Sequence, residues 1–240
     1  MINTDYELVE AYRKISPKYT NIKKKPWRDF KFYMDFIKKN FSLPTSGILL
    51  DIGAGNCRNL LFFENQKWEH IASDISLDLL KNAVMTKNNH IYKINHDMKS
   101  FPLRNYFIDM VICIAVFHHL RSNKEVLKVL QNINKALKAN KYLIISCWRR
   151  WKKGSRKMML KDLLLYPYKK LKDKMWRYGD IYLDWFDNNK EVVAKRYYHL
   201  FTKRELAKIV KKGGFEVLNC EKLGGVGGRD NIFLLLRNLA

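Results

Sequence analysis

Residues 49–61, with the sequence LLDIGAGNCRNLL, join a short apolar run to an acidic residue and two closely spaced glycines. A strand that ends in Gly-x-Gly predicts a tight turn, where a ligand can approach the backbone closely. Dinucleotide sites use such a loop with a third small residue, but this chain has Arg58 at that position. Asp51, at the end of the strand, suits a cationic cofactor better than an anionic one. The loop therefore favours S-adenosylmethionine, with Gly53 and Gly55 forming the turn.

Strands and helices alternate along the chain. Apolar runs predict seven strands, at 47–51, 68–74, 90–95, 107–117, 141–148, 215–223 and 231–238. Amphipathic or capped segments predict helices at 5–15, 28–40, 57–64, 76–87, 122–138 and 202–212, with a proline-marked loop at 16–27. This alternation is typical of a mostly parallel sheet with helices on both faces. We expect one domain over residues 1–240, in which residues 1–45 form a helical lid.

Carboxylates follow the second and third predicted strands. Asp74 lies 23 residues after Asp51, where a carboxylate can accept hydrogen bonds from both ribose hydroxyls of a cofactor. Asp97 follows the third strand, where a carboxylate can bond an adenine amine. Each residue alone has a plainer explanation, as a helix cap or a turn residue, but together they predict a cofactor site. Its expected residues are Asp51, Gly53, Gly55, Asp74, Ile75, Asp97, Met98 and Ala115.

The composition is strongly basic, with 46 Lys and Arg against 23 Asp and Glu and a net charge of +23. Such an excess favours a polyanionic partner, with nucleic acid ahead of an anionic membrane, although a lysine-rich proteome would also produce it. The four cysteines are far apart, so we expect neither a disulfide framework nor a metal site. No signal peptide is recognisable, and the longest apolar run falls short of the roughly 20 residues of a membrane span. We expect a cytoplasmic protein without a membrane partner.

Residues 149–195 interrupt the α/β pattern. Their first part, 149–177, holds 12 Lys and Arg and only 2 Asp, with aromatic residues and leucines between the charges. This insertion could be a solvated basic face, an amphipathic element on a membrane surface, or a segment that grips RNA. We favour RNA, because the basic side chains can neutralise phosphates and the aromatic rings can stack on unpaired bases. The residues expected to contact RNA are Lys23, Lys25, Trp27, Arg149, Arg150, Lys152 and Lys153.

Several stretches resemble one known family. They are YRKISPKY with KKKPW (12–27), the glycine loop (49–61), ASDIS (72–76), residues 95–120 ending in IAVFHHL, RYYHLFTKREL (196–206) and GGRDNIFLLL (227–236). On these stretches the chain resembles class I S-adenosylmethionine-dependent methyltransferases, and within them the wobble-uridine carboxymethyl methyltransferases that act on tRNA. Two positions depart from the family pattern. Cys57 replaces the third glycine of the loop, and Lys23 replaces an arginine of the N-terminal segment.

The resemblance implies methyl transfer to a carboxylate on a modified uridine of the tRNA anticodon loop. A carboxylate is already ionised near neutral pH, so the reaction needs groups that position it and no general base. The candidates for positioning are His118, His119, Arg196, His199, Arg229 and Asn231, with Asp230 orienting Arg229. Plainer structural roles are possible: a helix cap for the His pair, a packed loop residue for His199, and a surface ion pair for Arg229.

The resemblance also implies a partner, a small zinc-binding activator subunit that extends one edge of the sheet. Two other functions stay open at this stage. One is a methyltransferase of the same class that acts on a small molecule, and the other is a non-catalytic RNA-binding protein with a relic cofactor fold. The basic charge argues against the first, and the intact cofactor residues argue against the second.

The glycine run GGVGG (224–228) lies just before the last strand. The fold implied by the resemblance is a Rossmann-like, seven-stranded sheet that is parallel except for its last strand. The loop before that strand then lies at the carboxyl ends of the parallel strands, where ligands bind in open α/β sheets. We therefore expect this loop to hold Arg229 beside the acceptor.

Overall fold

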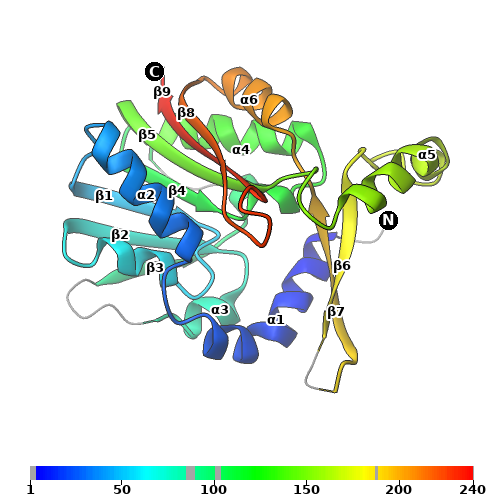
Figure 1. Ribbon diagram of the computed structural model, residues 1–240. Coiled ribbons are helices and arrows are strands. Elements are labelled where there is room, and N and C mark those ends of the chain that lie inside the picture. The colour runs from blue at the N-terminus through cyan, green and yellow to red at the C-terminus, as the bar shows by residue number, and fades with distance from the viewer. Residues whose placement is uncertain (1–3, 85–89, 101–103, 187–188, 240) are drawn as a thin grey trace.

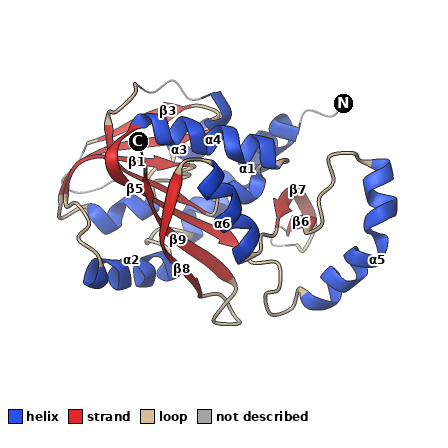
Figure 2. Ribbon diagram, turned by 90° about the horizontal axis from the view of Figure 1, so that it is seen from above, coloured by secondary structure: helices blue, strands red, loops and turns tan. Residues whose placement is uncertain are grey.

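A seven-stranded sheet forms the body of the protein (Figures 1 and 2). The computed structural model describes residues 4–84, 90–100, 104–186 and 189–239. The strands of the sheet are β1 (Ser46–Ile52), β2 (Lys67–Asp74), β3 (Ile91–Asn95), β4 (Ile108–Ile114), β5 (Leu137–Trp148), β8 (Phe215–Leu223) and β9 (Asn231–Asn238). Their order is β3-β2-β1-β4-β5-β9-β8, and β9 runs antiparallel to both of its neighbours. This topology confirms the predicted sheet with its antiparallel last strand.

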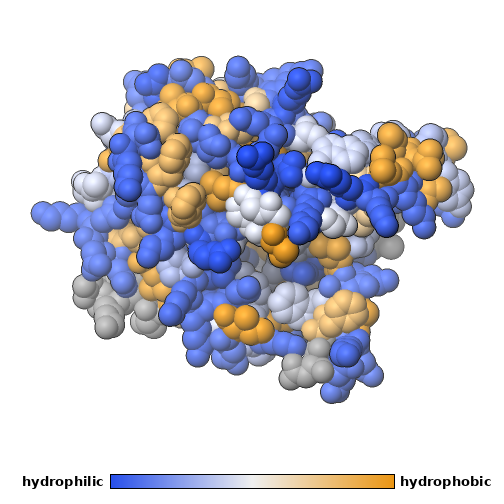
Figure 3. Space-filling model, viewed as in Figure 1, coloured by the Kyte–Doolittle hydropathy of each residue, from blue (hydrophilic) through white to orange (hydrophobic). Residues whose placement is uncertain are grey.

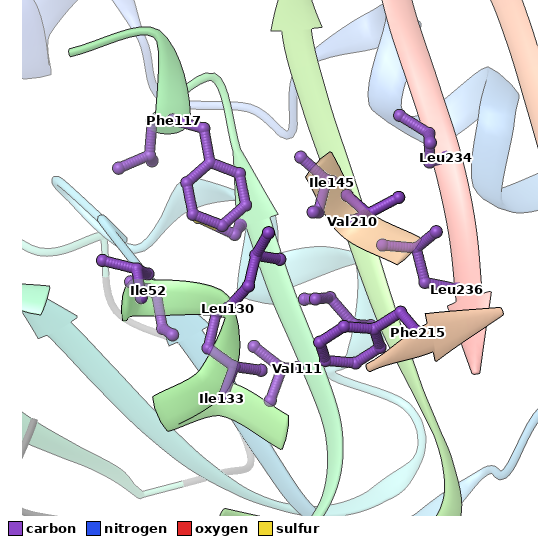
Figure 4. Packing of buried hydrophobic residues seen from close by; sticks show 14 of the residues in the cluster. Ile52, Val111, Phe117, Leu130, Ile133, Ile145, Val210, Phe215, Leu234 and Leu236 are labelled. Atoms are coloured by element: carbon purple, nitrogen blue, oxygen red, sulfur yellow. The ribbon is translucent and has the colours of Figure 1, made fainter. Parts of the chain in front are cut away.

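Helices cover both faces of the sheet. They are α2 (Arg28–Asn40), α3 (Leu77–Lys81), α4 (Asn123–Ala136) and α6 (Lys203–Lys212), with short 3-10 turns at Arg58–Phe63, Met98–Ser100 and Phe117–His119. A further helix, α1 (Thr4–Ile22), contacts α3 and lies at the carboxyl edge of the sheet. Successive residues of a strand point to opposite faces, and the two buried clusters follow this alternation. Leu50 and Val111 pack with α4 and α6, as Figure 4 shows for Val111, whereas Leu49 and Met110 pack with α2. Strands β1 and β4 are therefore apolar on both faces.

Predicted caps fix the starts of three helices. The Ser122 hydroxyl accepts a hydrogen bond from the Glu125 backbone N–H, and the Glu125 carboxylate accepts one from the Ser122 N–H. Thr202 and Glu205 form the same reciprocal pair at the start of α6. Ser76 caps α3 through the Leu79 N–H. Each cap satisfies backbone donors that lack a partner inside the helix, which is why these helices begin where they do.

The insertion is ordered into elements that the sequence pattern did not predict. Helix α5 (Arg156–Lys172) is followed by a hairpin of β6 (Asp180–Phe186) and β7 (Val192–His199). Figures 1 and 2 show α5 and the hairpin at one side of the sheet, with α1 next to β7. A small apolar cluster that includes Met159, Ile181 and Tyr198 joins α5 to the hairpin.

Some predicted boundaries were wrong. The loop predicted at 16–27 is helical as far as Ile22, because Tyr19 packs on Trp185 and Arg58 beyond the proline. The helix predicted at 57–64 is a 3-10 turn, since Cys57 takes a left-handed conformation with φ +62°. The helix predicted at 76–87 ends at Lys81, where the chain turns back to the glycine loop; its residues 85–87 lie outside the described residues. Strand β4 stops at Ile114, before Ala115 with φ +61°.

Candidate active site

A deep cleft opens at the carboxyl edge of the sheet, between helix α1 and the ends of β1, β2 and β4. It contains about 980 Å³ of empty space, which includes open solvent at its mouth. Of the residues predicted to bind the cofactor, seven lie on its wall: Gly53, Gly55, Asp74, Ile75, Asp97, Met98 and Ala115. This edge is where ligands bind in open α/β sheets. The cleft is therefore the candidate cofactor site.

The glycine loop forms the floor of the cleft, and its two glycines have different reasons to be glycine. Gly53 has φ +70°, and a Cβ there would collide with the side chain of Val116. Gly55 has φ +56°, but a Cβ there would meet only Leu79, at 3.8 Å. Gly53 thus lets the loop press against the end of β4, whereas Gly55 serves the turn and faces open space. Cys57 takes the third left-handed position with its side chain fully buried, so the turn forms without a third glycine.

Asp74 at the end of β2 is held in place by the backbone. One carboxylate oxygen accepts from the Gly55 N–H at 2.7 Å, and the other from the Ser76 N–H at 2.8 Å. Burial raises the pKa of Asp74 to about 6, against the opposing effect of these hydrogen bonds. The carboxylate is therefore ionised at neutral pH, and each oxygen keeps a lone pair. Such a group fits the two hydroxyls of a ribose.

Asp51 lies behind the loop and not on the cleft wall, in contrast to its predicted role as a direct ligand. Its side chain is buried, and neither of its oxygens has a hydrogen-bond partner. Burial and the nearby charge of Asp74 raise the pKa of Asp51 well above its ordinary value, while Arg58 acts in the opposite direction. A buried carboxylate without a partner beside the cleft fits a ligand with a cationic end, such as the methionine end of S-adenosylmethionine.

Asp97 and Ala115 complete the cleft wall from two further loops. Asp97 accepts from the Lys99 N–H at 2.9 Å, which fixes the turn after β3. The Ala115 N–H donates to the Ser146 hydroxyl at 3.0 Å, and this bond holds the backbone of Ala115 in its left-handed conformation. Strain of this kind at a non-glycine residue is common at functional sites.

His119 and Tyr12 form a hydrogen-bonded pair on the opposite wall. The Nδ1–H of His119 donates to the Tyr197 carbonyl at 2.9 Å, so a neutral ring has its lone pair on Nε2. The Tyr12 hydroxyl lies 3.0 Å from Nε2 and donates to it. Burial lowers the pKa of His119 to about 4, so the imidazole is neutral at pH 7. The wall at this point is uncharged.

His118 lies behind His119, off the cleft wall. Its ring packs against His119, Trp148 and Tyr198, with ring centres 4.7 to 5.2 Å apart. Its Nδ1 is buried without a hydrogen-bond partner, and burial lowers the pKa of His118 well below its ordinary value. The two neighbouring histidines therefore differ: His119 faces the cleft and His118 supports the aromatic cluster behind it.

Next to His118 and His119, Lys and Arg side chains and aromatic rings form a stack. The stack contacts the cleft wall where Tyr198 packs on His119. The Trp148 and Tyr198 rings lie 4.5 Å apart and nearly parallel, at 5°. Lys152 lies 4.2 Å from the Trp148 ring centre. Arg196 lies between Tyr198, at 5.3 Å, and Trp185, at 4.8 Å. Arg196 makes no ion pair with any carboxylate in the described part of the chain, although the aromatic rings hold its guanidinium in place.

Two predicted site residues lie elsewhere, in a buried charge network. His199 Nδ1 lies 2.6 Å from Asp180, and its Nε2 lies 2.9 Å from Glu205. Arg150 donates to Glu205 at 2.8 Å and to the Leu200 carbonyl at 2.9 Å. The network joins the hairpin, the start of α6 and the end of β5. The structure therefore does not bring His199 or Arg150 to the cleft, and their contacts are those of residues that hold elements together.

The loop between β8 and β9 wraps around two buried carboxylates. Asp230 accepts from the backbone N–H groups of Lys153, at 3.0 Å, and Gly227, at 2.7 Å. Asp29 of α2 accepts from the Gly225 N–H at 2.8 Å and from the Asn231 side chain at 3.1 Å. Asp230 and Asn231 therefore fix the loop, and the Asp230 carboxylate binds backbone N–H groups instead of forming the expected ion pair with the Arg229 side chain.

The side chain of Arg229 is exposed. The glycines are required because the two carboxylates fill the space that side chains at 224, 225 and 227 would occupy.

Two of these glycines provide a matched pair of substitutions. Gly224 and Gly228 have nearly equal φ, +68° and +69°, but a Cβ at Gly224 would overlap the Asp29 carboxylate, whereas a Cβ at Gly228 meets nothing within 4 Å. Gly228→Ala should therefore lower the free energy of unfolding by only about 1 kcal/mol, because alanine is strained in the left-handed conformation. Gly224→Ala should lower the free energy of unfolding by a further 1 kcal/mol or more. Equal losses in a urea titration would show that the loop does not enclose Asp29.

The other residues predicted to contact RNA differ in exposure, and only Trp27 among them lines the cleft. Trp27 lines the cleft and packs on Phe233, with ring centres 5.5 Å apart. Lys25 and Lys153 are exposed. Lys23, Arg149 and Lys152 are half-buried, and the Lys23 carbonyl accepts from Asn56 at 2.8 Å.

Sequence reasoning missed the contribution of helix α1. Leu8, Tyr12 and Tyr19 all line the cleft. Their spacing of four and seven residues places them on one helix face, which is the signal that could have found them. The role of Arg58 was also missed: it lines the cleft and lies over the Tyr19 ring at 5.9 Å.

A mostly parallel sheet of this order, with a glycine loop after β1 and a buried carboxylate at the end of β2, defines a Rossmann-like methyltransferase fold. A sequence model of the methyltransferase domain family matches residues 27–219. The chain belongs to this methyltransferase family, and S-adenosylmethionine is its cofactor. The described residues contain no cluster of three or more His, Cys, Asp or Glu that could hold a metal ion.

Similar sequences include proteins named as tRNA methyltransferases. The chain is 26% identical to a tRNA (carboxymethyluridine(34)-5-O)-methyltransferase of Schizosaccharomyces pombe, over 87% of this chain and 88% of the relative. A relative of the same name from Arabidopsis thaliana is 27% identical, over 58% of this chain but only 31% of its own length.

Solved structures show the same fold. A SAM-dependent methyltransferase from Methanosarcina mazei gives a TM-score of 0.68 at 19% identity, covering 85% of this chain and 97% of the other. A complex of the Haloferax volcanii Trm112 methyltransferase activator with a methyltransferase gives a TM-score of 0.66 at 10% identity, covering 97% and 98%.

Proposed function

We propose that this protein methylates the carboxymethyl group, or a related carboxylate, on the wobble uridine of tRNA. The observation that carries the proposal is the position of Arg196. It is held between two aromatic rings, lacks an acidic partner among the described residues, and lies next to the Tyr198–His119–Tyr12 wall of the cofactor cleft. The names of the distant relatives support the same acceptor.

The wall chemistry suits an acceptor that is already an anion. S-adenosylmethionine supplies an electrophilic methyl group when bound. A carboxylate needs only to be desolvated and held in line with that group. Arg196 can pair with it, while neutral His119 neither repels it nor withdraws a proton from it. A neutral acceptor such as an amine or hydroxyl would leave the guanidinium unpaired, which makes a carboxylate the better fit.

An RNA substrate agrees with the charge around the cleft. Arg149, Lys152 and Lys153 follow β5 directly, and the Arg149 N–H donates to the Asp230 carbonyl at 2.9 Å, which joins this segment to the glycine-rich loop. With a net charge of +23, the chain can neutralise several phosphates. We assign these side chains to the anticodon arm, and Trp27 and Arg229 to the mouth of the cleft.

We also propose a partner subunit of the activator type. Strand β3 ends the sheet and pairs only with β2 among the described strands, and its Tyr92 side chain is 55% exposed. An edge strand of this kind can be extended by a strand from another chain. The Haloferax neighbour forms a complex with such an activator, which supports the assignment.

Nucleoside mass spectrometry of tRNA from a strain lacking the gene tests the proposal. The methyl ester at the wobble uridine should disappear, and the free carboxylate form should accumulate. A wobble-uridine profile unchanged from the parent strain would overturn the proposed acceptor and leave a small-molecule substrate as the alternative.

A further inference from the structure

Helix α5 stands apart from the rest of the molecule. Figures 1 and 2 show it at the periphery, beyond the hairpin. Only its inner face is anchored: Met159 is fully buried, and Asp162 is buried with its carboxylate 2.7 Å from Lys169. Tyr166 packs on Tyr178. Met159 is the only α5 residue in a buried apolar cluster of the described residues. Packing inside the protein therefore does not explain apolar side chains on the other faces of this helix.

The outward face is nevertheless apolar. Its residues recur at intervals of three and four, which places them on one side of a helix. They are Leu160, Leu163, Leu164, Pro167, Tyr168 and Leu171, here called the outer stripe. Leu164 is 83% exposed and Leu171 is 82% exposed. Figure 3 shows hydrophobic atoms gathered on the lobe that carries α5. Neighbouring exposed leucines of this kind mark an interaction surface.

Basic side chains frame the stripe. Arg156 and Lys157 precede it, and Lys161 and Lys172 flank it. The only acidic residue of the helix, Asp162, points inward and is paired with Lys169. Every charge on the exposed surface of α5 is therefore positive. The exposed surface of α5 combines the apolar outer stripe with positive charges. A molecule that binds it must therefore offer both an apolar region and negative charge.

Three occupants fit poorly. A second copy of the helix would bring lysines against lysines. RNA would satisfy the lysines but not the leucines, because aliphatic side chains offer no ring on which a base can stack. Tyr168 is the one aromatic residue of the stripe, and Lys172 lies 4.8 Å from its ring centre. A protein partner could bury only a small area on this helix. A helix of 17 residues is about 26 Å long and about 10 Å wide, so one face offers roughly 260 Å². A stable protein–protein interface buries ~800 Å² on each partner.

The geometry points to an anionic phospholipid surface as the occupant of the outer stripe. Helices that lie in the membrane interface bury an apolar face among the acyl chains and keep Lys and Arg at the headgroups. A helix at the periphery can reach a flat surface without obstruction from the body. Among the helices of the described residues, none is long and apolar enough to cross a bilayer, so α5 would lie on the membrane. This inference departs from the expectation of no membrane partner and is independent of the proposed function.

Vesicle binding by the full-length protein tests the inference. We expect binding to phosphatidylcholine vesicles that contain phosphatidylserine, and little binding to phosphatidylcholine alone. Replacing Leu164 and Leu171 together by Ser should weaken partitioning about ten-fold or more. Phe32→Ser on α2 is the matched control: Phe32 is 67% exposed but lies on another helix, and its replacement should change nothing.

A second pair of variants tests the charge. Lys161→Glu with Lys172→Glu should abolish binding to the anionic vesicles, whereas Lys161→Arg with Lys172→Arg should retain it. All these positions are exposed, so thermal unfolding and tRNA methylation in solution should match the unmodified protein.

Three results would overturn the inference. The first is equal binding of the leucine variant and the unmodified protein, which would assign the interaction to net charge alone. The second is a failure to prefer anionic vesicles, seen either as equal binding to vesicles with and without phosphatidylserine or as no binding to either. The third is a loss of tRNA affinity in the leucine variant without a loss of vesicle binding, which would make α5 an RNA contact.

Discussion

Asp74→Ala is expected to abolish measurable binding of S-adenosylhomocysteine, the product form of the cofactor. The carboxylate is fixed by the Gly55 and Ser76 N–H groups, so its remaining lone pairs face the cleft. Two hydrogen bonds from ribose hydroxyls to an ionised group contribute about 3 kcal/mol or more, which corresponds to at least about a hundred-fold in affinity. Isothermal titration calorimetry on the purified protein measures this directly.

The matched control is Glu69→Ala, which removes an exposed carboxylate from the same strand and should leave the affinity unchanged. The pH dependence provides a check on the unmodified protein. Ribose hydroxyls donate more strongly to the ionised carboxylate than to the protonated carboxyl, and the pKa of Asp74 is about 6. Affinity should therefore be constant above that pH and fall as the pH drops through 6. Full affinity in Asp74→Ala would place the ribose elsewhere in the cleft.

Arg196→Ala is expected to reduce kcat/KM for tRNA by about a hundred-fold or more while the affinity for S-adenosylhomocysteine stays the same. The guanidinium lies beyond the cofactor wall and is held by Trp185 and Tyr198, so its loss removes the cation that we assign to the acceptor. Arg196→Lys keeps the charge but loses the planar fork, and an intermediate rate is expected. Single-turnover methylation of tRNA measures the effect.

Lys195→Ala removes an exposed charge from the neighbouring position of β7 and separates general RNA attraction from acceptor binding. It should lower tRNA affinity slightly and leave the single-turnover rate unchanged. Partial recovery of the Arg196→Ala rate on addition of guanidinium ions would locate the defect at the acceptor. A joint loss of turnover and cofactor affinity in Arg196→Ala would instead mean that the stack only supports the cleft.

The central part of the fold was predictable from the sequence because its signals are local. The apolar run of β4 fits a strand buried on both faces, and the strand–glycine–helix order around residues 49–61 fixes where the cofactor loop lies. Asp74 was found for the same reason: it ends a strand at the edge where the parallel strands converge. Most of the predicted cofactor residues lie on the cleft.

The parts that sequence reasoning misplaced depend on partners far away in the chain. Asp29 accepts a hydrogen bond from Asn231, which is 202 residues away in the sequence, and no local pattern predicts that pair. Arg150 and His199 resemble exposed functional residues in sequence, yet they meet Glu205 in a buried network. The strands of the β6–β7 hairpin, DIYLDWF and VVAKRYYH, mix charged, aromatic and aliphatic residues without a regular alternation, so they gave too weak a signal to identify.

The identity of the methyl acceptor is tested most directly by one measurement. The purified protein, with and without an activator subunit, is incubated with S-adenosylmethionine and tRNA from cells that accumulate the unmethylated carboxymethyl uridine. The nucleosides are then analysed by mass spectrometry before and after mild alkali. We predict a methyl group on the wobble uridine that alkali removes, as expected of an ester. An alkali-stable methyl group, or one on any other nucleoside, would contradict the account.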